Sequence, residues 1–252
     1  MPVLMLHSSL SSGRQWQALK RHWPGYECHT PDLLGYGAAA AELTRPFSLA
    51  QEAAAVTPWL EQQQAGSVSL IGHSYGGALA LHLARYYPKQ INALVLFEPV
   101  AFHLLAKEQD LEARQLLQEV QSLSAKMTDC SALQAAELFV DYWQQPGYFA
   151  ALPQVMQDKM ASQVWKVGAD FEALISEPAT LADYQNAIAC PVLLMTGKHS
   201  RCSARRISEL LHSVLVQSEW LETETGHMGP VSQPELVNSG ILKFLADQAL
   251  LT

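Results

Sequence analysis

The sequence predicts an α/β fold with a mostly parallel sheet, helices on both faces and an inserted helical lid. Three observations lead to this prediction. Short β-prone runs alternate with helix-prone runs at both ends of the chain. The runs at residues 91–97 and 191–196 are almost wholly apolar, as expected of strands buried on both faces. The stretch between them is helix-prone and much longer than a single crossover connection needs.

In the first part of the chain, strands are expected to alternate with helices. Ser48-Leu49-Ala50-Gln51 has the spacing of a helix capping box, which predicts one long helix from there to about residue 64. A shorter helix is expected over residues 14–22, and another after Gly76. The expected strands cover residues 3–6, 26–30, 68–71 and 91–97.

The last part of the chain repeats this alternation and completes the sheet. After the strand at residues 191–196, a helix is expected over residues 204–212 and a last strand over residues 213–220. Ser232-Gln233-Pro234-Glu235 has a capping serine followed by proline in the first turn. A closing helix is therefore expected to run from there to about Ala249.

Residues 102–186 are rich in Gln, Ala, Leu and Glu and contain no convincing strand. Their leucines and Val120 recur at helical spacing. An alternative is that these helices are only long crossover packing, but the excursion is too long for that and favours a lid. We therefore predict a core domain, residues 1–101 and 187–252, with the lid inserted between its two parts.

Composition limits the classes of function. The chain has 252 residues, 49% of them hydrophobic and 16% charged, as in a globular protein with a sizeable core. A net charge of −8 argues against nucleic acid and anionic membranes as partners. The four cysteines form no C-x-x-C pair, and no apolar run is long enough for a signal peptide or a membrane helix. We expect a cytoplasmic protein that acts on a small molecule.

Gly72-His73-Ser74-Tyr75-Gly76 reads G-x-S-x-G, with a β-prone run before it and a strong helix former after it. In that setting the serine sits on a sharp strand-to-helix turn, where its hydroxyl is exposed as a nucleophile. By itself the pattern is weak, because glycine and serine are common in ordinary turns. The surrounding strand and helix favour Ser74 as a catalytic nucleophile.

A serine nucleophile needs a base to take its proton. His227 follows Gly226 in the loop between the last strand and the last helix. Loops at the carboxyl edge of a parallel sheet converge on one site. A surface histidine is the alternative, but this position favours His227 as the base.

The acid that orients the base is not at its usual position. The loop after residues 191–196 contains no carboxylate, and Ser200 stands where an aspartate is expected. The strand at residues 91–97 ends in Glu98, one strand away from the serine and at the same edge. The alternative role for Glu98 is to pair with a lid cation or to cap a helix. The order Ser74, Glu98, His227 favours Glu98 as the acid.

An acyl-transfer site also needs N–H donors for the developing oxyanion. We expect the Tyr75 N–H to be one donor. The second is expected in the loop after the first strand, where we select Ser9, although this serine-rich turn could also cap the helix at Arg14. No histidines have the spacing of metal ligands and no phosphate or dinucleotide loop is present, so we expect neither metal nor cofactor.

Together these motifs resemble the α/β-hydrolase superfamily. The resemblance is carried by His7-Ser8-Ser9, Asp32-Leu33-Leu34-Gly35-Tyr36-Gly37, the G-x-S-x-G turn and Gly226-His227. This chain has Ser8 where the family usually has glycine, and it has no carboxylate at the usual position of the acid. Because the resemblance starts directly at the strand before His7, we do not expect the family's first β-hairpin. Some haloalkane dehalogenases are similar in placing a glutamate after the earlier strand, which supports Glu98.

The resemblance implies a serine hydrolase that cleaves an ester or related acyl bond of a small, apolar substrate. A C–C bond hydrolase or a cofactor-free lyase would have the same sequence pattern. A non-catalytic ligand receptor on this fold would be expected to lose Ser74 or His227, and both are present.

Overall fold

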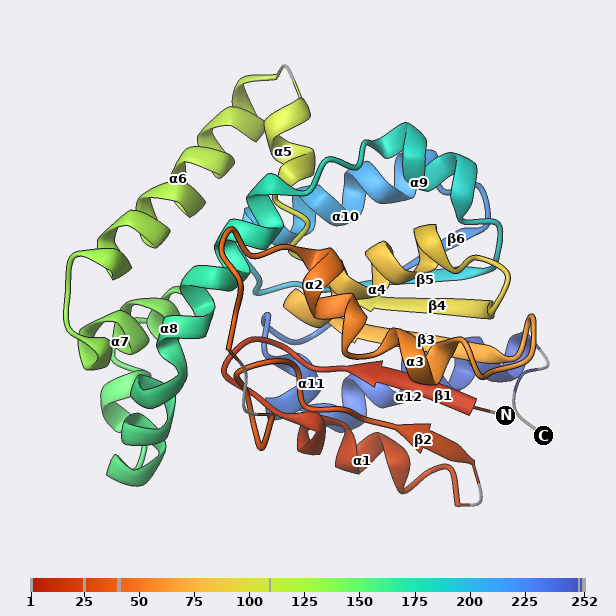
Figure 1. The fold of residues 1–252 in the computed structure, drawn as a ribbon, viewed down its shortest axis with the longest axis horizontal. Helices are drawn as coiled ribbons and strands as arrows, with labels where there is room; N and C mark the ends of the chain where they lie inside the picture. Colours follow the sequence, from red (N-terminus) through yellow and green to blue (C-terminus); the bar gives the residue numbers. More distant parts are fainter. Residues whose placement is uncertain (1, 25, 40–41, 109, 249, 251–252) are drawn as a thin grey trace.

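The computed structural model describes residues 2–24, 26–39, 42–108, 110–248 and 250. Its centre is a six-stranded sheet in the order β2-β1-β3-β4-β5-β6, and every neighbouring pair is parallel. The sheet confirms the predicted α/β class (Figure 1). The strands are β1 (Pro2–Leu6), β2 (Glu27–His29), β3 (Val68–His73), β4 (Ile91–Phe97), β5 (Val192–Gly197) and β6 (Ser218–Thr223).

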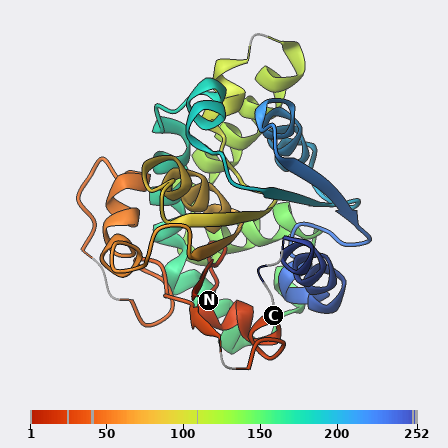
Figure 2. The same cartoon turned by 90° about the vertical axis from the view of Figure 1, so that its right-hand side faces the viewer.

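Helices connect the strands and cover both faces of the sheet, as Figures 1 and 2 show. Two short 3-10 turns, η1 (Gly13–Trp16) and η2 (Phe149–Ala151), accompany them. The α-helices are α1 (Gln17–Lys20), α2 (Leu49–Ala54), α3 (Thr57–Leu60), α4 (Tyr75–Tyr86), α5 (His103–Lys107), α6 (Leu111–Thr128), α7 (Ala132–Trp143), α8 (Gln154–Ser176), α9 (Leu181–Ala187), α10 (Cys202–Val214), α11 (Gly229–Ser232) and α12 (Pro234–Asp247).

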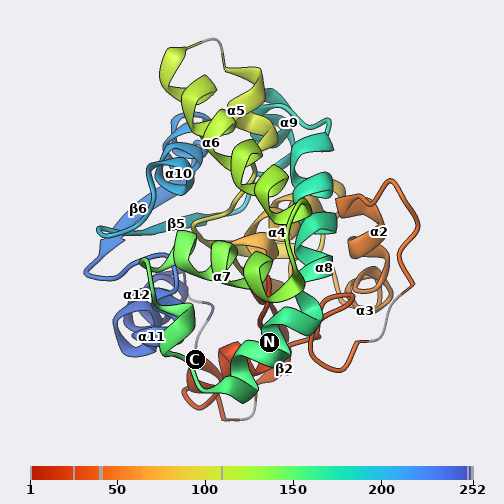
Figure 3. The ribbon, with the colours of Figure 1, turned by 90° about the vertical axis from the view of Figure 1, so that its left-hand side faces the viewer.

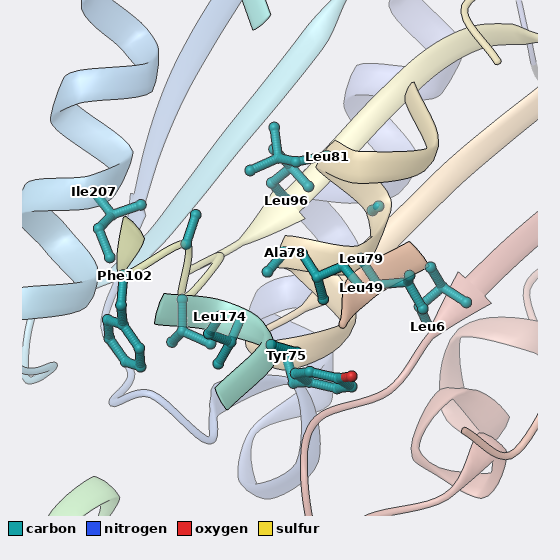
Figure 4. Packing of buried hydrophobic residues seen from close by; sticks show 14 of the residues in the cluster. Leu6, Leu49, Tyr75, Ala78, Leu79, Leu81, Leu96, Phe102, Leu174 and Ile207 are labelled. Carbon is teal, nitrogen blue, oxygen red and sulfur yellow. The ribbon is translucent and has the colours of Figure 1, made fainter. Parts of the chain in front are cut away.

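The apolar side chains of each strand alternate between two cores, as the pleat of a strand requires. In β1, Leu4 and Leu6 belong to the larger core, with α2, α4 and α10. Val3 and Met5 point to the smaller core, with α1 and α12. Figure 4 shows Leu79 of α4 and Leu49 of α2 close to Leu6 in the larger core. The sheet is thus buried on both faces, which holds its carboxyl edge rigid.

Two predicted elements, a helix and a strand, differ from the structure in their bounds. The helix expected from Ser48 to residue 64 is broken into α2 and α3, although the Ser48 capping box forms as predicted. Pro58 explains the break, because proline lacks an N–H and its ring clashes with the preceding helical turn. The last strand starts at Ser218, since residues 213 and 214 extend α10.

The closing helix also differs from its prediction. Ser232 does not cap it, because this residue ends the short helix α11 and its Oγ donates to the Met228 carbonyl. Helix α12 begins at Pro234, so the proline lies in the first turn of the helix, as predicted. Ala249, the predicted end, lies outside the described residues.

The described residues between β4 and β5 are helical, without a strand. Helices α6, α7 and α8 lie together at the carboxyl end of the sheet, far from the two chain termini (Figures 1 and 3). Helix α9 instead packs against α4 and α10, beside the sheet. Within the described ranges, no helix is both long and apolar enough to cross a membrane.

Candidate active site

Ser74 lies on a sharp turn between β3 and α4. Its φ of 56° lies in the left-handed region, which non-glycine residues rarely adopt and which is typical of a strained functional position. The flanking glycines are needed for close packing: a Cβ on Gly72 would lie 2.4 Å from the Gly76 carbonyl oxygen. A Cβ on Gly76 would lie 2.4 Å from the Leu6 carbonyl oxygen. The local backbone therefore has the strand–turn–helix geometry expected for a nucleophile.

The structure brings Ser74, His227 and Glu98 together in one hydrogen-bonded chain. The Ser74 Oγ and His227 Nε2 atoms are 2.9 Å apart, and His227 Nδ1 is 2.6 Å from Glu98 Oε2. All three side chains are buried. With Nδ1–H donating to the carboxylate, Nε2 is free to accept the serine proton.

Glu98 is held by its backbone as well as by its partners. It follows β4 directly, with a φ of 46°, and its Oε1 accepts a 2.6 Å hydrogen bond from the Gly197 N–H. Gly197 ends β5, so the carboxylate reaches across to the neighbouring strand. The Ser200 Oγ is buried without a hydrogen-bond partner among the described residues. Glu98, rather than Ser200, thus contacts the histidine.

The two residues selected as oxyanion donors both lie next to Ser74. Tyr75 is the first residue of α4, and Ser9 lines the same cavity as Ser74. Neither N–H donates a hydrogen bond to another described residue. Ser9 precedes Leu10, whose φ of 55° gives the loop a tight bend. Among the described residues, both N–H groups are thus without a hydrogen-bond acceptor, as expected of oxyanion donors.

Two neutral histidines support this geometry, and the sequence did not single them out for that role. His73 Nε2 donates to the His227 carbonyl oxygen at 2.8 Å, which fixes the loop that carries the base. His7 Nε2 accepts a 2.9 Å hydrogen bond from the Leu33 N–H, and its Nδ1 donates to the Ser8 carbonyl oxygen. Burial lowers the pKa of His73 well below its usual value and that of His7 to about 4.

A buried charge network behind the serine was also missed. Lys166 of α8 contacts both Glu52 of α2 and Asp170 of α8, and its side chain is completely buried. Burial raises the pKa of Asp170. Helical periodicity places Lys166 on a face of α8, but its partner Glu52 is 114 residues away in sequence. No local signal in the sequence identifies such a pair.

A cavity of about 130 Å³ opens beside Ser74 and His227. Its walls are mostly apolar and come largely from α7, α8 and the segment between them; they include Phe139, Val140, Trp143, Tyr148, Leu152, Met156 and Met160. A second, much smaller space of about 10 Å³ also borders Ser74 and is lined by Phe102, Phe171 and Leu174. A larger surface hollow, about 700 Å³, lies along α8 and contacts none of the three hydrogen-bonded residues.

Trp143 of α7 lines both of the spaces that border Ser74. Its ring stacks on the imidazole of His227, with centroids 4.0 Å apart and 25° between the planes. Phe102 and Phe139 pack against the same indole. Trp143 therefore limits the space beside Ser74 together with Phe139, which also lines both spaces.

The site can hold a proton-transfer chain without a metal ion. Among the residues that the structure describes, no three His, Cys, Asp or Glu side chains gather so that they could bind one. The arrangement of hydroxyl, imidazole and carboxylate can deprotonate a serine and return the proton to a leaving group.

Comparison with known proteins identifies the class. The model of the alpha/beta hydrolase family matches residues 3–239, and the chain belongs to that family. It is therefore a hydrolase, and both the predicted superfamily and the predicted enzyme class are confirmed.

Individual relatives show how far the similarity extends. Lipase LipV of Mycobacterium tuberculosis is 39% identical over 97 residues, which span 38% of this chain and only 36% of the lipase. The 3-oxoadipate enol-lactonase 2 of Acinetobacter baylyi is 23% identical, over 95% of this chain and 87% of its own. The solved esterase of Exiguobacterium antarcticum has a TM-score of 0.75 at 19% identity, over 98% of this chain and 92% of its own, which shows the shared fold.

Proposed function

We propose that this protein is a serine hydrolase that cleaves an ester of a small, apolar molecule through an acyl-enzyme. The observation that carries the proposal is the hydrogen-bonded chain from Ser74 through His227 to Glu98. The apolar walls of the adjoining cavity support an apolar substrate. The lipase and enol-lactonase among the relatives support ester or lactone chemistry.

In the first half of the proposed reaction, Ser74 Oγ attacks the acyl carbon while His227 Nε2 takes its proton. The carbonyl π electrons move to the oxygen, and the N–H groups of Tyr75 and Ser9 bind the resulting oxyanion. Glu98 stabilises the imidazolium through Nδ1–H. As the C–O bond to the alcohol breaks, His227 returns the proton to the leaving alkoxide, which leaves an acyl-serine.

In the second half, water repeats the sequence. His227 takes a proton from water, and the hydroxide attacks the acyl carbon to form a second oxyanion in the same place. The bond to Ser74 Oγ then breaks, and His227 returns the proton to the serine. The products are a carboxylic acid and an alcohol, and no cofactor enters the balance.

Residues 102–186 are proposed to act as the lid over this site. Residues of α7, of α8 and of the segment between them line the cavity, which supports a role in selecting the substrate. A small-molecule substrate and a cytoplasmic location remain predictions.

Turnover of p-nitrophenyl esters of graded acyl length tests the proposal. We expect measurable hydrolysis of at least the short esters by the wild type, and a loss of about 10³-fold or more in kcat for Ser74→Ala. A folded wild-type protein that hydrolyses none of these esters would contradict ester hydrolysis. The C–C hydrolase and lyase alternatives would then be the ones to assay.

A further inference from the structure

The side chains of the two oxyanion residues are joined by a continuous chain of buried polar contacts. Ser9 Oγ donates to Asp170 Oδ2 at 2.6 Å, and Asp170 Oδ1 accepts from Lys166 Nζ. The same ammonium group donates to Glu52 Oε2 at 2.8 Å, and this oxygen also accepts from the Tyr75 hydroxyl at 2.9 Å. A single lysine thus stands midway between Ser9 and Tyr75.

The three charged side chains of this chain are shielded from water, whereas Ser9 is partly exposed. The side chains of Lys166 and Glu52 are 0% exposed and that of Asp170 is 2% exposed. The lysine ammonium also lies 4.6 Å from the centroids of both the Tyr75 and Phe47 rings. In such surroundings charges interact more strongly than in water, and their partners have few alternative positions.

The remaining contacts tie the network to the loop between β2 and α2. The Tyr36 hydroxyl donates to Asp170, and the Leu34 N–H donates to Glu52 Oε1 at 2.8 Å. Lys166 and Asp170 lie one turn apart on α8, which belongs to the helical segment between β4 and β5. The network therefore joins the helical segment between β4 and β5 to Ser9 and to Tyr75, the two residues proposed to bind the oxyanion.

We infer that Lys166, through Asp170 and Glu52, is a positioning residue that sets the spacing of the Ser9 and Tyr75 N–H donors. The inference rests on the proposed function, because it assumes that these two donors bind an oxyanion. Buried ion pairs are often no better for stability than apolar residues of similar volume. Their demanding geometry makes them suitable for fixing two backbone donors that must meet one oxygen atom.

Two mild substitutions break the ends of the chain without removing a donor. Ser9→Ala and Tyr75→Phe each delete one hydroxyl contact and keep the backbone N–H and all three charges. Asp170→Asn and Lys166→Met act at the centre. The matched control is Glu177→Gln, which alters another buried contact of the same segment, to His82 of α4, but touches neither oxyanion residue.

Each variant is measured in three ways. The first is kcat on the best p-nitrophenyl ester, per active site titrated with a fluorophosphonate. The second is inhibition by a trifluoromethyl ketone of the same acyl length, whose tetrahedral adduct places an oxyanion between the two donors. The third is inhibition by the corresponding ether, which has no carbonyl group and reports substrate binding alone.

We expect kcat to fall about tenfold in Ser9→Ala and Tyr75→Phe, and about 100-fold in Asp170→Asn and Lys166→Met. These losses do not exceed the loss in kcat expected when a whole oxyanion donor is removed. The inhibition constant of the ketone should rise by the same factors, while that of the ether and the properties of Glu177→Gln stay near wild type. If the network were merely structural, the inhibition constants of the ketone and of the ether would instead rise together, or only the number of titrated active sites would fall.

Wild-type kcat and ketone inhibition in both Ser9→Ala and Tyr75→Phe would overturn the inference, whether or not Lys166→Met folds. An equal loss in Glu177→Gln would overturn it as well. A wild-type protein with no ester turnover and no labelled Ser74 would overturn the proposed function, and the inference with it.

Discussion

At the scale of single residues, the position of Glu98 carries most of the chemical argument. The carboxylate contacts His227 Nδ1 at 2.6 Å and the Gly197 N–H at 2.6 Å, so both of its oxygens are used. A positive φ at Glu98 turns the side chain away from the course of β4. Ser200 offers only a hydroxyl, which cannot stabilise an imidazolium as a carboxylate does.

Glu98→Gln is expected to lower kcat by about 10³–10⁴-fold, because the amide cannot stabilise the imidazolium and can hold the wrong tautomer of His227. Steady-state hydrolysis of the best p-nitrophenyl ester measures the effect. Glu224→Gln is the matched control, since Glu224 is exposed, lies in the same loop as His227 and pairs with Lys198. A folded Glu98→Gln enzyme with a near-normal kcat would remove Glu98 from the mechanism.

The sequence predicted the site residues best where they follow the ends of strands. Ser74, Glu98 and His227 could be selected because each follows a recognisable strand, and parallel strands end at one edge. Lys166 and Asp170 could not, because a charged residue in a helix is usually exposed and its distant partner is set only by tertiary packing. The capping box at Ser48 predicts where a helix begins but not where it ends, and the helix breaks before Pro58.

At the scale of elements, α7 matters most for the site. It contributes Phe139, Val140 and Trp143 to the cavity, and Trp143 stacks on His227. The sequence Phe139-Val140-Asp141-Tyr142-Trp143 predicts that this segment supplies an apolar pocket, with packing as the alternative, but it does not predict how the helix is placed over the serine. That depends on how α6, α7 and α8 pack on one another, which helical periodicity does not specify.

Trp143→Ala is expected to join the two spaces beside Ser74 and to shift the acyl preference toward longer chains. Each methylene group that a hydrophobic pocket can bind changes kcat/KM by about tenfold or more. The ratio of kcat/KM for decanoyl esters to kcat/KM for butyryl esters should therefore rise at least about tenfold. Trp143→Phe keeps a ring on His227 and serves as the control. An unchanged chain-length profile in Trp143→Ala would show that the indole does not limit the pocket.

At the scale of the whole molecule, buried neutral histidines link stability to pH. Burial lowers the pKa of both His7 and His103 to about 4 from the usual 6.5. Between these values the unfolded chain binds more protons than the folded one, so the free energy of unfolding falls as the pH falls. The raised pKa of Asp170 acts in the opposite direction.

His7 alone is expected to contribute about 3 kcal/mol of stability above pH 6.5, all of it lost by about pH 4. Urea unfolding at about pH 7 and about pH 4.5 measures the total change, and NMR titration of ¹⁵N-labelled histidine isolates His7. A His7 imidazolium at pH 6 in the folded protein, or a free energy of unfolding that stays constant, would contradict this prediction.

The central claim is that Ser74 is a nucleophile activated by His227, and covalent capture tests it most directly. The wild type is incubated with a fluorophosphonate, and the modified peptide is identified by mass spectrometry. We predict one adduct per chain, located on Ser74, and no adduct in Ser74→Ala. An unlabelled wild type, or equal labelling of Ser74→Ala, would contradict the claim.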